Sequence, residues 1–197
     1  MMLREISVVP NSALPLDEFA SHMRLGTGFS GAGGEDAALI AYLRAALAAI
    51  EGRTAKVLLS RDFTLSLAYW RGSVQPLAVA PVSAVTEVRI VGADGTVTTV
   101  EPERYRLVRD LARPRLEGRG GMLPVLPEGA TAEIDLTAGF GPEWSNLPVD
   151  LQQAVFLLAT QYFELRHDGA AEISAMPFGV MALIERWRTV RVLGGRG

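Results

Sequence analysis

One stretch with almost no charge constrains the fold more than any other feature. Residues Val149 to Phe163, VDLQQAVFLLATQYF, contain a single charged residue, Asp150. The apolar residues recur at the spacing of one helical face: Leu151, Ala154, Val155, Leu158, Tyr162 and Leu165. The opposite face, where a surface helix carries charges, holds Gln152, Gln153, Phe156, Thr160 and Phe163. A helix that is apolar nearly all round is buried on more than one side. We therefore expect Gln152, Phe156 and Phe163 to contact another subunit, as in an assembly component.

The composition predicts a soluble globular protein with a core of ordinary size. The 197 residues are 49% hydrophobic and 21% charged, and the net charge of -3 gives no general attraction to nucleic acid. No run approaches the roughly 20 apolar residues of a membrane span, and Arg4 and Glu5 interrupt the start of any signal peptide. Without cysteine there is no disulfide, thiolate nucleophile or cysteine metal site. We expect synthesis in the bacterial cytoplasm and no membrane partner.

The hydrophobic period divides the chain into helices, then strands, then helices. Helical spacing predicts helices at 15–25, 35–53 and 148–168. Alternation with a period of two predicts strands at 62–69, 85–91, 96–100, 105–108 and 132–137. Asp94-Gly95 is expected to form a two-residue hairpin turn, and Arg113 to Gly121 an exposed loop.

This order of elements predicts an α+β fold. The helices from both ends of the chain pack as a small bundle, and an antiparallel β-sheet is inserted at 55–139. We expect residues 1–168 to form one domain. Residues 169–197 then follow as a linker, a short helix and a tail.

A glycine-rich segment, Gly26-Thr27-Gly28-Phe29-Ser30-Gly31, matches the GxGxxG pattern of dinucleotide-binding turns. That chemistry needs a preceding strand, which delivers the pyrophosphate to the start of a helix. Here a predicted helix precedes the segment, and no parallel βαβ pattern follows. We expect a flexible connection.

The titratable residues do not form a recognisable catalytic set. Glu18 and His22 lie one helical turn apart, and Glu164 and His167 form one E-x-x-H pair, whereas a metal site needs more ligands. No G-x-S-x-G motif is present. Four strand carboxylates occupy positions of the solvated face: Asp62, Glu87, Glu133 and Asp135. The sequence predicts no catalytic residue, cofactor or metal ion, and a small cytoplasmic enzyme using His22 or His167 stays an alternative.

A cluster of arginines and glycines lies in the predicted loop at 113–121. Arg113, Arg115 and Arg119 could contact phosphates, but no interleaved aromatic residue makes a platform for single-stranded nucleic acid. A solvated hairpin tip is the simpler interpretation, and repetition around a ring would turn it into a basic annulus. A DNA-binding module based on these arginines is the second alternative.

The C-terminal segment combines Phe178 and Trp187 with several arginines, after a linker rich in helix-breaking residues. Tryptophan and arginine are the residue types most enriched at interface hot spots. The segment could also fold back onto its own core. We favour contact with a partner, because the linker gives the segment reach.

Taken in order, several motifs resemble those of the head–tail connector (adaptor) proteins of long-tailed phages and phage-like gene transfer agents. The resemblance covers nearly the whole chain. The matching stretches are Leu16-x-Glu18-x3-His22-x-Arg24-Leu25, residues 35–53, Pro81-Val82, Thr137-Ala138-Gly139-Phe140-Gly141, Leu147-Pro148-x2-Leu151-x2-Ala154, and Pro177-Phe178-Gly179-Val180 with Trp187-Arg188.

The resemblance implies a structural virion protein and not an enzyme. It implies a ring of twelve copies at the head–tail junction, between the portal protein and a tail-side stopper or tail terminator. DNA would pass through the lumen, with non-specific contacts to Arg113, Arg115 and Arg119. The segment from about Asp168 would dock onto the portal, with Trp187 as its buried anchor. The other portal-binding residues would be Phe178, Val180, Ile184, Arg186, Arg188 and Arg191.

Overall fold

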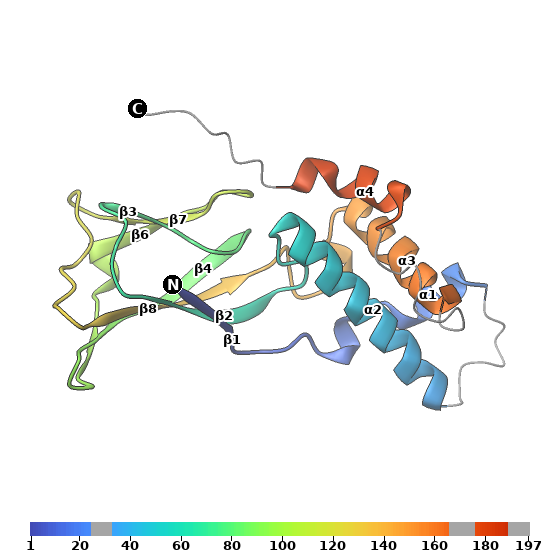
Figure 1. The fold of residues 1–197 in the computed structure, drawn as a ribbon, viewed down its shortest axis with the longest axis horizontal. Coiled ribbons are helices and arrows are strands. Elements are labelled where there is room, and N and C mark those ends of the chain that lie inside the picture. Colours follow the sequence, from blue (N-terminus) through green and yellow to red (C-terminus); the bar gives the residue numbers. More distant parts are fainter. Residues whose placement is uncertain (25–32, 166–175, 189–197) are drawn as a thin grey trace. The chain divides into compact units, whose positions relative to one another are not determined.

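The structure is a computed structural model of the chain that describes residues 1–24, 33–165 and 176–188 (Figure 1). These residues form two compact units. The β unit contains Met1–Val9 and Leu59–Pro142, and the helical unit contains Pro10–Leu58 and Glu143–Gly197. The helices that precede and follow the main strand region therefore belong to one unit, and the antiparallel sheets belong to the other. This arrangement confirms the predicted α+β class.

A five-stranded antiparallel sheet dominates the β unit. Its strands lie in the order β1-β2-β8-β4-β5. Their bounds are β1 Met2–Glu5, β2 Arg61–Leu67, β8 Thr131–Ala138, β4 Val82–Val91 and β5 Val97–Thr99. Alternation along β8 buries Ala132, Ile134 and Leu136, while Glu133 and Asp135 point to the opposite face. Strand β1 and the exposed β5 are the two edges of this sheet.

A second sheet corrects the prediction of an exposed loop at 113–121. Strand β7, Arg115–Gly118, is the central strand between β3, Val74–Pro76, and β6, Tyr105–Val108. Leu116 is fully buried and pairs with Gln75 and Leu107. The strand ends at Gly118, where a side chain would collide with the backbone of Met122. One buried residue among arginines and glycines is too short a pattern to show alternation.

Two further details of the β unit differ from the prediction. Strand β1 was not expected, and it joins the N-terminal residues to the sheet through β2. The β4–β5 hairpin has a three-residue loop, because the Gly92 amide donates to the Thr96 carbonyl across it. Gly95 lies in this loop at a φ of 83°, a conformation that favours glycine.

In its described residues, the helical unit contains the three longer predicted helices and the short helix predicted for the C-terminal segment. Their bounds are α1 Leu16–His22, α2 Gly33–Thr54, α3 Val149–Glu164 and α4 Phe178–Ile184. Short 3-10 turns precede α3 at Trp144–Asn146 and follow α4 at Glu185–Trp187. Helix α3 packs against both α2 and α4, and its buried residues are Leu151, Ala154, Val155, Leu158 and Ala159.

Helix α2 divides into a leucine face and an alanine face. Leu39, Leu43 and Leu47 are buried, together with Ile50. The exposed positions between residues 36 and 50 are all alanine: Ala37, Ala38, Ala41, Ala45 and Ala48; Gly52 and Arg53 are exposed at the end of the helix. The exposed side of this long helix therefore has little charge. In the described part of the chain, no helix is long and apolar enough to cross a membrane.

Replacing Leu116 with alanine tests whether β7 is a buried strand. The change should lower the free energy of unfolding by about 2–5 kcal/mol, because it leaves a cavity on the buried face of this sheet. Leu111→Ala is the matched control, since Leu111 is 60% exposed in the nearby loop and should change stability by no more than about 0.5 kcal/mol. Urea unfolding followed by circular dichroism measures both. Equal losses for the two variants would contradict a buried β7.

Candidate functional site

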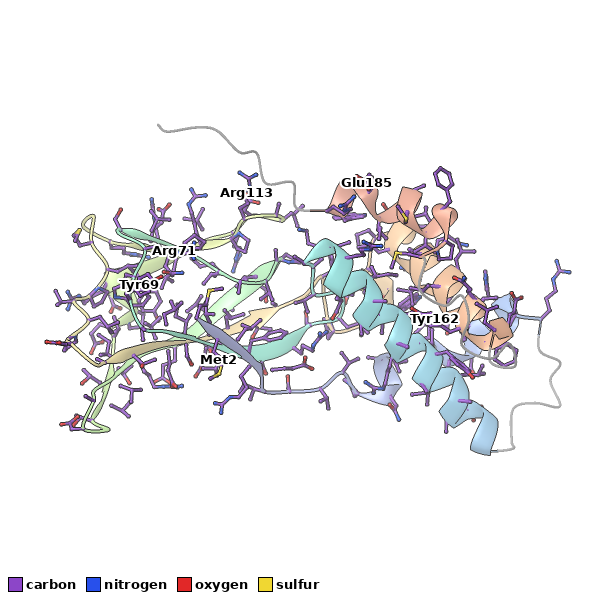
Figure 2. All side chains as sticks on the ribbon, viewed as in Figure 1. Met2, Tyr69, Arg71, Arg113, Tyr162 and Glu185 are labelled. Carbon is purple, nitrogen blue, oxygen red and sulfur yellow. The ribbon has the colours of Figure 1, made fainter. Side chains whose placement is uncertain are left out.

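The predicted portal-binding residues divide into buried and exposed side chains. Val180 and Ile184 are 0% and 1% exposed, and they lie on the face of α4 that packs against α3. They contribute to the core of the helical unit itself. Phe178 is 86% exposed and Met181 is 39% exposed, so the outer face of α4 presents apolar side chains to solvent. Glu185, labelled in Figure 2, begins the turn that follows.

Asp150 holds the last described turn of the C-terminal segment against α3. Its Oδ2 atom accepts a hydrogen bond from Trp187 Nε1 at 2.8 Å and forms an ion pair with Arg186 Nε at 2.7 Å. The Arg186 guanidinium also lies 4.7 Å from the centre of the Trp187 ring. Asp150, the only charge between Val149 and Phe163, thus binds Trp187, the predicted portal anchor, within the same chain. Arg188 pairs with Glu185 at 3.0 Å, and Arg191 lies outside the described residues.

The three predicted subunit-interface residues have partners inside the helical unit. The Phe156 ring stacks on Trp144 at 5.2 Å and lies 5.6 Å from Phe19. Phe163 meets Tyr42 edge-on at 6.0 Å. The side-chain amide of Gln152 donates to the backbone carbonyls of Leu147 and Trp144, just before α3 begins. All three residues are half-buried, so each keeps some surface for a further contact.

The predicted DNA-contacting arginines differ in their surroundings. Arg113 and Arg119 are exposed, and Figure 2 shows Arg113 on the surface of the β unit. Arg115 lies on β7, where its Nε atom is 2.8 Å from a carboxylate oxygen of Glu117. Arg106 of β6 approaches the other oxygen of Glu117 at 2.7 Å. Hydrogen bonds from Arg115 and then Arg106 hold the pKa of the Glu117 carboxyl below its usual range.

Two shallow hollows flank the pair formed by Arg106 and Glu117. The first, of about 690 Å³, is lined by Arg109 and Arg115 and by the aliphatic residues Ala84, Val85, Leu107 and Val108. We call it the basic hollow. The second, of about 640 Å³, is lined mainly by Arg119 and by the glycine-rich turn that follows β7.

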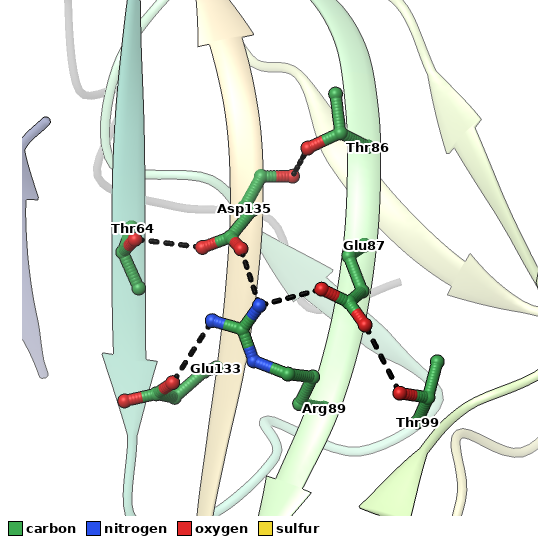
Figure 3. Close-up of polar contacts among 7 residues, drawn as sticks. All are labelled: Thr64, Thr86, Glu87, Arg89, Thr99, Glu133 and Asp135. Carbon is green, nitrogen blue, oxygen red and sulfur yellow. Dashed lines mark hydrogen bonds and ion pairs between the residues drawn. The ribbon is translucent and has the colours of Figure 1, made fainter. Parts of the chain in front are cut away.

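A cluster around Arg89 was missed in the sequence. Figure 3 shows its guanidinium among three carboxylates on one face of the five-stranded sheet. Nη1 lies 2.6 Å from both Glu87 and Asp135, and Nη2 lies 3.1 Å from Glu133. Hydrogen bonds to Asp135, Glu133 and Glu87 raise the pKa of Arg89 above its ordinary value. Side-chain exposures of 23% to 38% make the cluster half-buried, not part of a fully solvated face.

Register explains both the cluster and why the sequence did not show it. Glu87 pairs with Asp135, and Arg89 pairs with Glu133, so alternating residues of β4 and β8 share one face. Thr64 of β2 and Thr99 of β5 donate hydroxyl hydrogen bonds to Asp135 and Glu87 (Figure 3). The alternation along each strand was visible in the sequence. The pairing between strands was not.

The other predicted features are only partly covered by the described residues. The His22 ring packs 5.3 Å from the ring of Phe156. Among the residues with described positions, no three His, Asp or Glu side chains come together as a metal site. His167 and the GxGxxG loop lie outside these residues.

The comparisons identify the kind of protein. No protein-family model and no curated protein matches this chain. One solved chain, from the neck of an empty gene transfer agent (GTA) particle computed with C6 symmetry, is 65% identical with a TM-score of 0.89. A chain from the virion of a native GTA particle is 65% identical with a TM-score of 0.87. A chain from the neck of a native GTA particle computed with C12 symmetry is 61% identical with a TM-score of 0.85. In each pair, 100% of both chains is covered.

This similarity places the chain among structural virion proteins. It belongs to the family of neck proteins of gene transfer agent particles, and the resemblance to head–tail connectors is confirmed. Neck proteins of this family are structural components of the particle and not enzymes.

Replacing Arg89 with methionine should destabilise the β unit. The change leaves three half-buried carboxylates facing one another without their shared cation, so we expect a loss on the order of 1–3 kcal/mol in the free energy of unfolding. Arg71→Met is the control, because Arg71 is an exposed arginine of the same unit. Urea unfolding measures the difference between the two variants. A loss no greater for Arg89→Met than for Arg71→Met would show that the cluster contributes little.

The lowered pKa of Glu117 predicts a pH dependence with a definite sign. Because the folded state lowers this pKa, the ion pairs stabilise the protein fully above the ordinary glutamate pKa. That contribution is lost as the pH falls through the lowered value. Replacing Arg106 and Arg115 with glutamine should move the Glu117 titration midpoint upward in a carboxyl NMR titration. Arg71→Gln should leave it in place, and an unmoved midpoint in the double variant would contradict the assignment of these arginines as the cause.

Proposed function

We propose that this chain is the repeating subunit of a head–tail adaptor ring in the neck of a gene transfer agent particle. The ring lies between the portal protein and a tail-side stopper or tail terminator, and DNA passes through its lumen. The observation that carries the proposal is full-length identity of 61–65% to chains in GTA neck and virion structures. Neck structures computed with C6 and C12 symmetry support a closed ring, and twelve copies satisfy both symmetries.

The ring needs a surface that joins each copy to the next. A closed ring uses a head-to-tail contact, in which one face of a subunit meets a different face of its neighbour. The alanine face of α2 suits such packing, because burying it removes few charged groups from water. Phe156, Phe163 and Gln152 keep their proposed role through the exposed parts of their half-buried side chains.

The portal contact is proposed on the outer face of α4 and the turn after it. Phe178 is an exposed apolar residue at the start of α4, and Arg186 and Arg188 are exposed in and just after the turn that follows this helix. Val180, Ile184 and Trp187 support this surface by holding the segment on α3. Because the same contact is repeated around the ring, each single contact can be weak while the assembly as a whole is stable. Isolated subunits then stay monomeric until the portal brings them together.

The lumen contact with DNA is proposed for Arg113 and Arg119. Both side chains are exposed, whereas Arg115 forms an ion pair with Glu117. Contact with phosphates is independent of sequence and depends on salt, which suits DNA that moves through a channel. A single copy is expected to bind DNA negligibly, because only a few arginines act at once.

Replacing Phe178 with aspartate should prevent recovery of the portal. The test is an affinity pull-down from producer-cell lysate with the tagged full chain, with partners identified by mass spectrometry. A charge at the exposed start of α4 removes the apolar contact without opening the core. The matched control is Val125→Asp, since Val125 is also 86% exposed but lies in the β unit.

Three results are distinguishable in this pull-down. Recovery of the portal by the unaltered chain and the control, but not by Phe178→Asp, supports the proposed docking surface. Recovery by all three moves the docking surface away from α4. A chain that recovers no virion protein at all contradicts the adaptor function.

A further inference from the structure

The Arg89 cluster carries a surplus of negative charge. Its three carboxylates, Glu87, Glu133 and Asp135, outnumber the single guanidinium, which leaves a net charge of 1 - 3 = -2. We call these four residues the acidic sheet surface. Their exposed fractions of 23% to 38% keep the carboxylates within reach of a partner's side chains. The cluster is held in place by hydroxyl groups of neighbouring strands, so its charges have fixed positions.

The basic hollow carries the opposite surplus. Arg106, Arg109 and Arg115 line it with one carboxylate, Glu117, so its net charge is 3 - 1 = +2. Arg106 and Arg115 are 62% and 41% exposed, although both contact Glu117. Arg109 forms no ion pair with any residue in the described ranges. The remaining lining is aliphatic, which suits a protein surface better than a nucleic-acid backbone.

The charged residues of the two surfaces lie on different strands of the same unit, and Ala84 and Val85 of β4 belong to the aliphatic lining of the basic hollow. The acidic sheet surface lies on β4 and β8, and the arginines of the basic hollow lie on β6, β7 and the loop between them. Within the described part of the chain, no ion pair joins one surface to the other. A chain with two different patches of equal and opposite charge has the features that a head-to-tail contact requires.

We infer that the basic hollow of one copy receives the acidic sheet surface of the neighbouring copy in the ring. The inference rests on the proposed ring and adds a second contact to the one proposed for the helical unit. Each exposed ion pair is weak and screened by salt, so the contact acts through repetition around the ring. The main effect of this contact is on specificity, because a contact between two acidic surfaces, or between two basic hollows, would bring like charges together.

Crosslinking in assembled particles tests the contact directly. The chain has no cysteine, so two introduced cysteines are the only thiols it carries. Leu111→Cys places one beside the basic hollow, two residues after Arg109, and Val97→Cys places the other on β5, two residues before Thr99 and on the same face of the strand. Both positions are exposed, and all charges of the two surfaces are retained. Particles from producer cells are treated with a short bis-maleimide and analysed on a denaturing gel.

The expected result is a ladder of dimers, trimers and larger products from the double-cysteine chain. Adding Arg106→Glu and Arg109→Glu to this chain should remove the ladder, measured per copy incorporated into particles. Each single-cysteine chain should give no ladder. A second control replaces Val97→Cys with Val125→Cys, which is also exposed but lies outside the acidic sheet surface.

The failures of the two proposals look different. A double-cysteine chain that enters particles but forms no ladder, or only an internal crosslink, overturns the contact and leaves the ring in place. A ladder that survives the arginine reversal, or that is as strong with Val125→Cys, also overturns it. Absence of the unaltered chain from purified particles overturns the proposed function itself.

Discussion

The burial of α3 on several sides is the constraint on which the helical unit depends. This helix has no charged face to give to water, so other elements must cover it. Helix α2 covers it with leucines, α4 covers it with Val180 and Ile184, and the Phe156 ring lies against Phe19 and Trp144. Much of the cover expected from another subunit therefore comes from the chain itself. Asp150, the single charge between Val149 and Phe163, fixes the last described turn on the same surface.

Local periodicity was enough to predict most of the secondary structure. The helices at 35–53 and 148–168 and the strand at 132–137 have strong patterns, and each is present. Strand β7 was missed because Leu116 is the only buried residue of this four-residue strand, which lies among arginines and glycines. The Arg89 cluster was missed because it depends on which strands pair, and in what register. A tryptophan and arginines after a linker give the same sequence pattern whether they contact a partner or the chain's own core. The contact between Trp187 and Asp150 therefore could not be predicted from the sequence.

The two units present surfaces of different chemistry for assembly. The helical unit offers an uncharged alanine face on α2 and the exposed Phe178 on α4. The β unit offers fixed charges, with the acidic sheet surface around Arg89 and the basic hollow around Glu117. Apolar packing supplies most of the stability of a lasting contact, and charge selects the partner and the orientation. A structural neck protein needs both, because its copies must join one another in one direction and also join other virion proteins.

The most direct test of the adaptor account is electron cryo-microscopy of necks from particles purified from the producer cells. The account predicts that this chain fits the density as a closed ring of twelve copies next to the portal, with Phe178 on the portal side. It also predicts that neighbouring copies place β4 and β8 of one beside β6 and β7 of the next. A complete neck whose density has no place for this chain, or a chain bound elsewhere on the particle, would contradict the account.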